Sequence, residues 1–195
     1  MTNFDTPVYV VDVIGQVVSA TETEVLSVIK ANEDAVFGAG ETRISSLGYY
    51  KGSFEELIED LAQKDGSQEE RYKKYPLVYL VRDFEEVRGR EAGIYCSVSL
   101  RVIIIHQTQQ TYKIKDRETR VFKPVLYPIY NEFMRQLSLH PMINQSGVEN
   151  IRHIKIDRAY WGQNQQQASN KVALNDYVDA IEIRNLELKI NYSNC

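Results

Sequence analysis

A single helical pattern constrains the fold of this chain more than any other feature of its sequence. Between residues 122 and 137, apolar side chains recur at the spacing of one helix face for about four turns. They are Phe122, Val125, Leu126, Ile129, Tyr130, Phe133, Met134 and Leu137. A stripe this long has to be covered by other apolar surface, so we predict a helix that lies across a sheet. Pro124 is tolerated in the first turn, whereas Pro128 predicts a kink.

Strand patterns flank this helix on both sides. Residues 77–81 form an apolar run typical of a buried strand, and residues 96–106 alternate between apolar and polar positions before they turn apolar on both faces. The glycines within residues 85–93 predict a connection, so we expect these two strands to pair as an antiparallel unit. Residues 151–161 predict a third strand.

The last predicted strand contains a shift in its pattern. Apolar side chains occupy odd positions up to Ile183 and even positions from Leu186 onward. Because side chains alternate between the two faces of a strand, the inward phase slips by one residue at Arg184-Asn185. We predict a β-bulge at this place.

The N-terminal part of the chain predicts helices and irregular structure. Residues 7–18 have helical spacing, although their valine content also suits a strand, and we favour the helix. Two patterns typical of capping boxes, at residues 21–24 and 53–56, predict the beginnings of two helices.

Together these patterns predict one α+β domain that spans residues 1–195. Its core is expected over residues 75–190, in the order strand, strand, long helix, strand, strand. We therefore expect an antiparallel (mixed) sheet packed by one long amphipathic helix, with residues 1–70 as an N-terminal helical appendage.

Charge is distributed unevenly along the chain. Residues 1–70 carry 14 acidic and 4 basic side chains, whereas residues 71–123 carry 12 basic and 6 acidic ones. A molecule with one acidic and one basic part can associate head to tail with copies of itself. The alternative is that both segments are simply solvated. The 13 tyrosines suit either strands or surfaces that become buried against a partner.

Part of the basic segment is a candidate oligomer interface. Its residues are Lys113, Lys115, Arg117, Arg120 and Lys123. The same side chains could contact the phosphates of a nucleic acid. However, few aromatic residues lie among them and the formal net charge of the chain is −4, which is untypical of a dedicated nucleic-acid-binding protein. A subunit interface or a solvated helix start is favoured.

Patterns that would indicate catalysis, a cofactor or a metal are sparse. The histidines, His106, His140 and His153, are not spaced as zinc ligands are. No glycine run has the spacing of a dinucleotide loop or a P-loop. The carboxylates of residues 83–86 fit a solvated rim better than an acid–base cluster. We therefore expect a protein without catalytic residues, metal or cofactor.

One enzymatic alternative stays open, a metal-dependent nuclease of the Asp…Glu-x-Lys kind. Glu187 and Lys189 lie in the last predicted strand, and Asp176 and Asp179 are near in sequence. In such a site the carboxylates would hold a divalent cation and the lysine would help to activate water. The same spacing arises freely in any amphipathic strand.

Membrane insertion is not expected from the sequence. Apolar runs such as residues 102–105 end after about four residues, far short of the ~20 that span a bilayer. The N-terminus lacks the basic and apolar regions of a secretion signal.

The order and pattern of residues 75–190 resemble a known family. The segment Tyr75-Pro76-Leu77-Val78-Tyr79-Leu80, the strand over 96–106, the helix FKPVLYPIYNEFMRQL and the bulged closing strand carry the likeness. They resemble head-tail connector proteins of tailed bacteriophages, of the tail-terminator or neck-ring type, and are most similar to those from phages of Bacteroides-like hosts. Residues 1–70 do not map onto that family.

The resemblance implies a non-catalytic structural subunit located in the neck or tail of a virion. Its copies would form a ring, a hexamer or a dodecamer, around the channel through which DNA passes. The ring would contact adjacent neck or tail proteins through polar loops, here residues 64–74 and 162–175. A generic protein-binding module that never self-assembles is the other alternative to this function.

Overall fold

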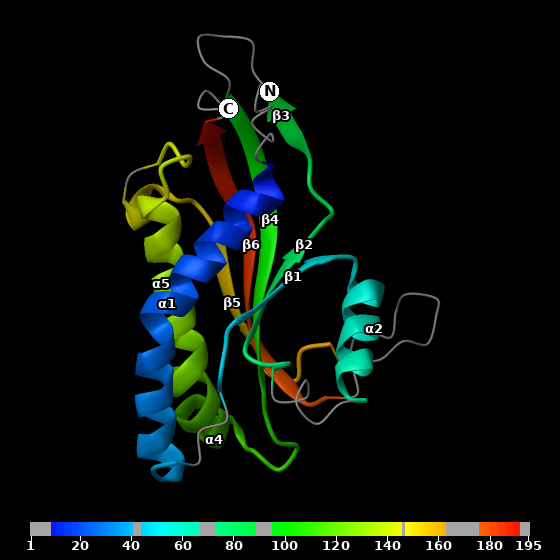
Figure 1. Ribbon diagram of the computed structural model, residues 1–195, viewed down its shortest axis with the longest axis vertical. Coiled ribbons are helices and arrows are strands. Elements are labelled where there is room, and N and C mark those ends of the chain that lie inside the picture. Colours follow the sequence, from blue (N-terminus) through cyan, green and yellow to red (C-terminus); the bar gives the residue numbers. More distant parts are fainter. Residues whose placement is uncertain are drawn as a thin grey trace, which may run out of the picture.

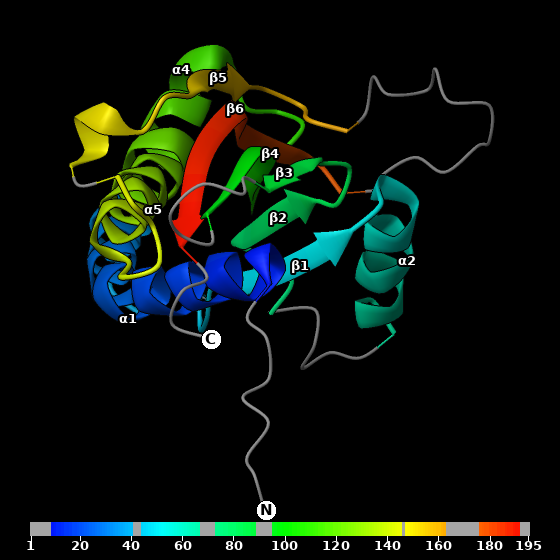
Figure 2. The ribbon, with the colours of Figure 1, turned by 90° about the horizontal axis from the view of Figure 1, so that it is seen from above.

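The computed structural model describes residues 9–40, 44–66, 73–88, 95–145, 147–162 and 176–191. It has the predicted α+β architecture, with a mixed sheet and helices on both of its faces (Figures 1 and 2). The expected loop at residues 162–175 lies almost entirely outside the described residues, as does most of the loop at 64–74.

The sheet has six described strands, five of which follow the order β1-β2-β4-β6-β5. They are β1 Gly48–Gly52, β2 Leu77–Val81, β3 Glu86–Arg88, β4 Tyr95–Gln107, β5 Ile154–Arg158 and β6 Val178–Asn191. β1 runs parallel to β2, and every other pairing is antiparallel. β3 pairs with the first part of β4 and β2 with its later part, so the two short strands lie on the same side of β4.

The structure confirms four predicted strands. The expected antiparallel pair is β2 and β4, the strand expected at 151–161 is β5, and the last predicted strand is β6. Two short strands were not predicted. β1 consists of two glycines around Tyr49-Tyr50-Lys51, and β3 has only three residues, so neither has a strong pattern of its own. β1 gains its ladder hydrogen bonds from β2, and β3 gains them from the longer β4.

The long predicted helix is built from three consecutive helical segments. They are α4 Ile114–Arg117, the π-helical segment η1 Glu118–Leu126 and α5 Tyr127–Leu139. Pro124 lies within η1 and Pro128 in the first turn of α5. Proline has no N–H, so Pro128 leaves the carbonyl of Pro124 without its α-helical donor. The side-chain amide of Asn32 donates to that carbonyl instead, at 3.1 Å.

Helix α1, Val10–Phe37, packs beside α5 and η1 on one face of the sheet (Figures 1 and 2). The predicted helix at 7–18 is confirmed over its described residues, but the predicted helix start at residues 21–24 is wrong. Thr21 is buried within the 28-residue α1, and its hydroxyl donates to the Val17 carbonyl at 2.8 Å. The apolar stripe of α1 continues past Thr21, through Val25 to Ile29, so packing outweighs the capping pattern.

The N-terminal segment was expected to be an appendage, but it packs into the core of the domain. Its helices are present, but α1 shares one hydrophobic core with α5, β4 and β6, and β1 extends the sheet. Helix α2, Phe54–Lys64, begins as predicted, because Ser53 and Glu56 form a reciprocal capping box.

The two faces of the sheet are covered to different extents. α1, η1 and α5 cover one face along its length. On the opposite face, and within the described part of the chain, α2 and Trp161 cover only the part formed by β2, the end of β4 and the start of β6. The rest of that face, which we call the open sheet face, carries Ser97, Ser99 and Arg101 of β4 and Glu182, Arg184, Glu187 and Lys189 of β6.

The bulge predicted in the last strand is confirmed. Leu100 pairs with Leu186 and Val102 with Ile183, so Arg184 and Asn185 together oppose Arg101. Asn185 has φ +50°, the left-handed conformation in which asparagine is favoured over most residues. Because of this extra residue, Glu182, Arg184, Glu187 and Lys189 all lie on the open face.

Candidate functional site

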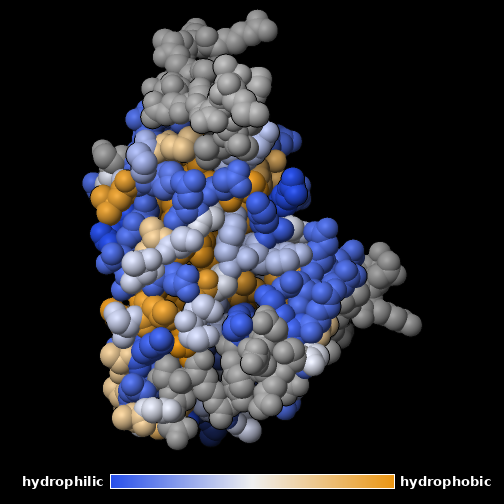
Figure 3. Space-filling model, in the orientation of Figure 1, coloured by the Kyte–Doolittle hydropathy of each residue, from blue (hydrophilic) through white to orange (hydrophobic). Residues whose placement is uncertain are grey.

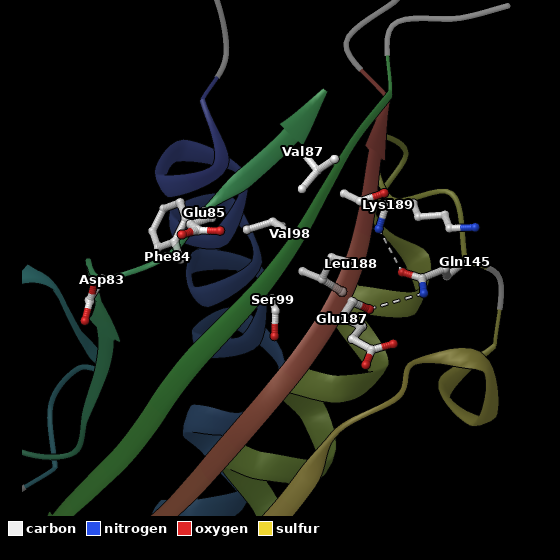
Figure 4. Close-up of a pocket in the computed structure, with 11 residues that line it drawn as sticks. Asp83, Phe84, Glu85, Val87, Val98, Ser99, Gln145, Glu187, Leu188 and Lys189 are labelled. Carbon is white, nitrogen blue, oxygen red and sulfur yellow. Dashed lines mark hydrogen bonds between the residues drawn. The ribbon is translucent and has the colours of Figure 1, made fainter. Parts of the chain in front are cut away.

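The upper part of the open sheet face contains a hollow of about 660 Å³. Asp83 and Glu85 lie on its β3 side, Ser99 on β4, and Glu187 and Lys189 on β6 (Figure 4). The side chain of Gln145 closes the β6 edge, since it donates to the Glu187 carbonyl and accepts from the Lys189 amide. Phe84 and the exposed Val87 add apolar surface, as in ligand or partner sites.

The residues of the nuclease alternative are not brought together. Glu187 and Lys189 line the hollow, but Asp179 lies eight residues earlier on β6, roughly 25 Å away at the rise of a strand. Asp179 and Asp176 are engaged elsewhere, with Arg117 and Lys74. β4 lies between Asp83 or Glu85 and Glu187 (Figure 4), and the described residues contain no group of metal-ligating side chains.

The middle of the open sheet face holds a cluster that sequence patterns did not predict. Arg101 of β4, Arg158 of β5 and Arg184 of β6 converge on the carboxylate of Glu182. Arg184 donates at 2.9 Å and Arg158 at 3.3 Å, and Arg101 forms an ion pair on the other oxygen. We call these four residues the arginine cluster.

Glu182 is almost completely buried by the arginines that surround it. Its side chain is 1% exposed, whereas those of the three arginines are 40–45% exposed. Burial alone would raise the Glu182 pKa, but the hydrogen bonds and charges of Arg184 and Arg101 outweigh it and hold the pKa below its usual value. The folded state therefore favours the ionised carboxylate.

We expect Glu182→Gln to lower the free energy of unfolding by about 2 kcal/mol, between the values for exposed and buried ion pairs. Because the folded-state pKa is lowered, this stabilisation is present above the unfolded pKa, about 4.3, and is lost as the pH falls through the folded value. Urea unfolding between neutral and acidic pH should show a shallower pH dependence in the variant.

Glu187→Gln is the matched control for this measurement. It removes an exposed glutamate from the same strand, 3.9 Å from Arg152, and should change stability by less than about 0.5 kcal/mol. An unfolding midpoint in Glu182→Gln equal to that of the unmodified chain would contradict the role given to the cluster.

The five residues of the predicted oligomer interface do not form one surface. Lys113, Lys115, Arg120 and Lys123 are exposed around α4 and η1, and we call these four residues the basic surface. Ile114, 83% exposed, lies among them, whereas Asp116 and Glu118 reduce the net charge there. Arg117 points inward and is buried, so it cannot contact a partner.

Arg117 is the centre of a buried network that joins four segments. Its guanidinium forms an ion pair with the fully buried Asp179 and donates to the carbonyls of Gln109, at 3.1 Å, and Tyr112, at 3.0 Å. It also stacks on the Tyr160 ring, 3.6 Å from the centroid. The sequence offered no sign that this arginine differs from its basic neighbours, because its ion-pair partner Asp179 is 62 residues away.

An acidic surface lies on another side of the molecule. The outward residues of α2 are Glu55, Glu56, Glu59 and Asp60, which we call the acidic surface. Hydrophilic side chains gather over this helix (Figure 3), and both ribbon views place α2 far from α4. The charge asymmetry of the sequence is thus partly preserved, as two separate surfaces of opposite sign.

The three histidines make separate contacts. His153 and Tyr130 are 2.6 Å apart, His140 contacts Gln16 at 3.1 Å, and His106 lies 3.6 Å from Glu33. His106 lies in β4 and His153 directly before β5. None of the three histidines lines either hollow of the open sheet face.

No family model matches the chain, and searches of curated proteins and of solved structures found no match. Among the described helices, none has both the length and the apolar character needed to cross a lipid bilayer.

Proposed function

We propose that this chain is a non-catalytic subunit of a homo-oligomeric ring in the neck or tail of a tailed bacteriophage, as a tail terminator or head-tail connector. The observation that carries the proposal is the pair of oppositely charged surfaces on different sides of one subunit. A head-to-tail ring needs two different complementary patches on each copy. The acidic surface on α2 and the basic surface around α4 meet that requirement.

The chemistry of the basic surface also fits a contact between proteins. Exposed Ile114 can supply apolar area, while the lysines and Arg120 around it provide a charged rim. Aromatic rings stand beside the rim, since the Arg120 guanidinium lies 5.2 Å from the Tyr112 centroid and 5.9 Å from that of Phe37. Arginine and aromatic side chains are enriched where proteins bind each other.

Assembly through these surfaces should depend strongly on salt. The Debye length falls from about 30 Å at 0.01 M to about 3 Å at 1 M ionic strength, so the attraction between surface charges is screened. We expect light scattering and negative-stain electron microscopy to show closed rings of one stoichiometry at low salt and smaller species at high salt.

Mass that stays that of a single chain at every salt and protein concentration would contradict the proposal. That outcome would favour the alternative of a binding module with a different partner. Mg²⁺-dependent cleavage of DNA that is lost in Glu187→Ala would instead support the nuclease, and would overturn the non-catalytic role.

A further inference from the structure

The arginine cluster opens onto a hollow of its own, separate from the one beside β3. This hollow has a volume of about 190 Å³, and its walls include the four cluster residues and Trp161. Sites for drug-sized ligands usually measure about 300–1,000 Å³. The hollow therefore suits one small chemical group rather than a whole nucleotide or cofactor.

The cluster holds more positive charge than its structural role requires. Three guanidinium groups surround a single carboxylate, which leaves an excess of two positive charges in one place. Each guanidinium carries five N–H donors, and Glu182 has only two oxygens to accept them. The arginine side chains are 40–45% exposed, so donors remain available to a ligand from solvent.

Buried donors in the walls provide an independent observation. Trp161 is 5% exposed, and its Nε1 has no hydrogen-bond partner among the described residues. The Nε of Arg101 is likewise buried without a partner in the described part of the chain. Glu182 Oε1, the ion-pair partner of Arg101, is also buried without a hydrogen-bond partner there, so the Arg101 donor has an acceptor beside it. Buried N–H groups are nearly always paired, so the indole N–H of Trp161 is the donor that indicates a missing acceptor.

The walls are held in place before any ligand arrives. The arginines come from three adjacent strands, β4, β5 and β6, and the bulge at Asn185 fixes the direction of the strand at Arg184. Edge-on contacts with Phe54 at 5.5 Å and Tyr79 at 6.4 Å fix the Trp161 ring. Such preorganisation lowers the entropic cost of binding.

We propose that this hollow binds a phosphate group in its doubly charged form, as inorganic phosphate or a small phosphomonoester. A phosphomonoester carries −1.5 to −2 charges at about pH 7 and presents three acceptor oxygens, which match the excess charge and the donors from several directions. A carboxylate or a phosphodiester carries one negative charge and would leave the cluster unbalanced. This inference goes beyond the assembly role, since no cluster residue belongs to the acidic or basic surface.

The single tryptophan of the chain makes a direct test simple. Trp161 is the only Trp, so its indole N–H gives one unambiguous cross-peak in a ¹H–¹⁵N correlation spectrum. Above the second phosphate pKa of about 6 and at constant ionic strength, we expect inorganic phosphate to shift this peak along a saturable curve. O-phosphoserine should act in the same way if the site accepts a monoester, while chloride and the diester dimethyl phosphate should have little effect.

Substitutions test whether the arginine cluster is the site that binds phosphate. Arg158→Gln and Arg184→Gln should each weaken phosphate binding by about tenfold or more, because each removes charge-assisted hydrogen bonds. Arg152→Gln, which removes an 83%-exposed arginine just before β5, should leave binding unchanged. The dispersion of the remaining cross-peaks shows in the same spectra that each variant is folded.

Three results would overturn the proposal. The first is a shift of the Trp161 peak that grows linearly with phosphate, or that chloride produces equally. The second is a phosphate affinity in Arg184→Gln equal to that of the unmodified chain. The third is binding of dimethyl phosphate as tight as that of inorganic phosphate. Each of these results concerns phosphate binding alone, so none of them decides whether rings form.

Discussion

Arg117→Leu is expected to lower the free energy of unfolding by about 3–5 kcal/mol, the typical cost of removing one member of a buried ion pair. Asp179 is fully buried, and its other hydrogen bond among the described residues is the one it accepts from the Tyr160 amide, at 3.0 Å. Without the guanidinium its charge would be uncompensated, and the carbonyls of Gln109 and Tyr112 would lose their donors. Urea unfolding followed by circular dichroism measures the difference.

Arg120→Leu is the matched control for this effect. It makes the same chemical change three residues later, at an exposed arginine that lies near the rings of Phe37 and Tyr112 and donates to the Tyr112 hydroxyl at 3.5 Å. Its loss should cost at most about 1 kcal/mol. The double variant Arg117→Leu/Asp179→Leu should recover part of the loss, since replacing both members of a buried pair with apolar residues is often tolerated. Equal stability in the Arg117 and Arg120 variants would show that the buried pair contributes nothing.

The contrast between these two arginines shows where sequence patterns reach their limit. Arg117 and Arg120 belong to one basic run, and both fit a solvated helix start. Burial separates them, because the end of β4 and the start of β6 bring Asp179 to Arg117 alone. That proximity depends on the pairing of β4 with β6, which brings in Asp179 from 62 residues away in sequence, and no local pattern predicts it.

Elements with strong local periodicity were predicted well. The helix at 122–137, the strands at 77–81 and 96–106 and the bulge at 184–185 all follow from the spacing of apolar side chains. β1 and β3 were missed because their hydrogen bonds depend on neighbouring strands. The capping pattern at 21–24 wrongly predicted a helix start, because the apolar stripe of α1 continues through these residues.

The arginine cluster was missed for a related reason. Arg101, Arg158 and Arg184 each occupy a polar position of an amphipathic strand, where a solvated side chain is the usual expectation. Only the register, which places Ile156 opposite Glu182 and Arg101 opposite the bulge, brings them to one carboxylate. A glutamate among apolar residues, in Ile181-Glu182-Ile183, was the one local sign that this position is buried.

The geometry of assembly can be tested with two variants that each lose one charged surface. The first, Lys113→Gln/Lys115→Gln/Lys123→Gln, neutralises the basic surface, and the second, Glu55→Gln/Glu59→Gln/Asp60→Asn, neutralises the acidic one. Losing three ion pairs of about 1 kcal/mol each should weaken self-association by about 100-fold, so each variant alone should be a single chain by light scattering.

A control variant separates the loss of these surfaces from a general change in charge. Arg82→Gln/Arg152→Gln/Lys189→Gln removes three exposed charges elsewhere and should still form rings. If it also fails to assemble, the charged surfaces on α2 and around α4 are not the specific contacts.

Mixing the two neutralised variants should give a dimer with one copy of each. A head-to-tail interface joins the acidic surface of one copy to the basic surface of the next, so the mixture retains one intact interface and cannot extend further. Charge reversal extends the test, because a Lys→Glu variant of the basic surface and a Glu→Lys variant of the acidic one rebuild both interfaces when mixed. Rings of alternating copies should then return. Mixtures that stay monomeric would mean that the two surfaces do not bind each other, and would contradict the proposed head-to-tail contact.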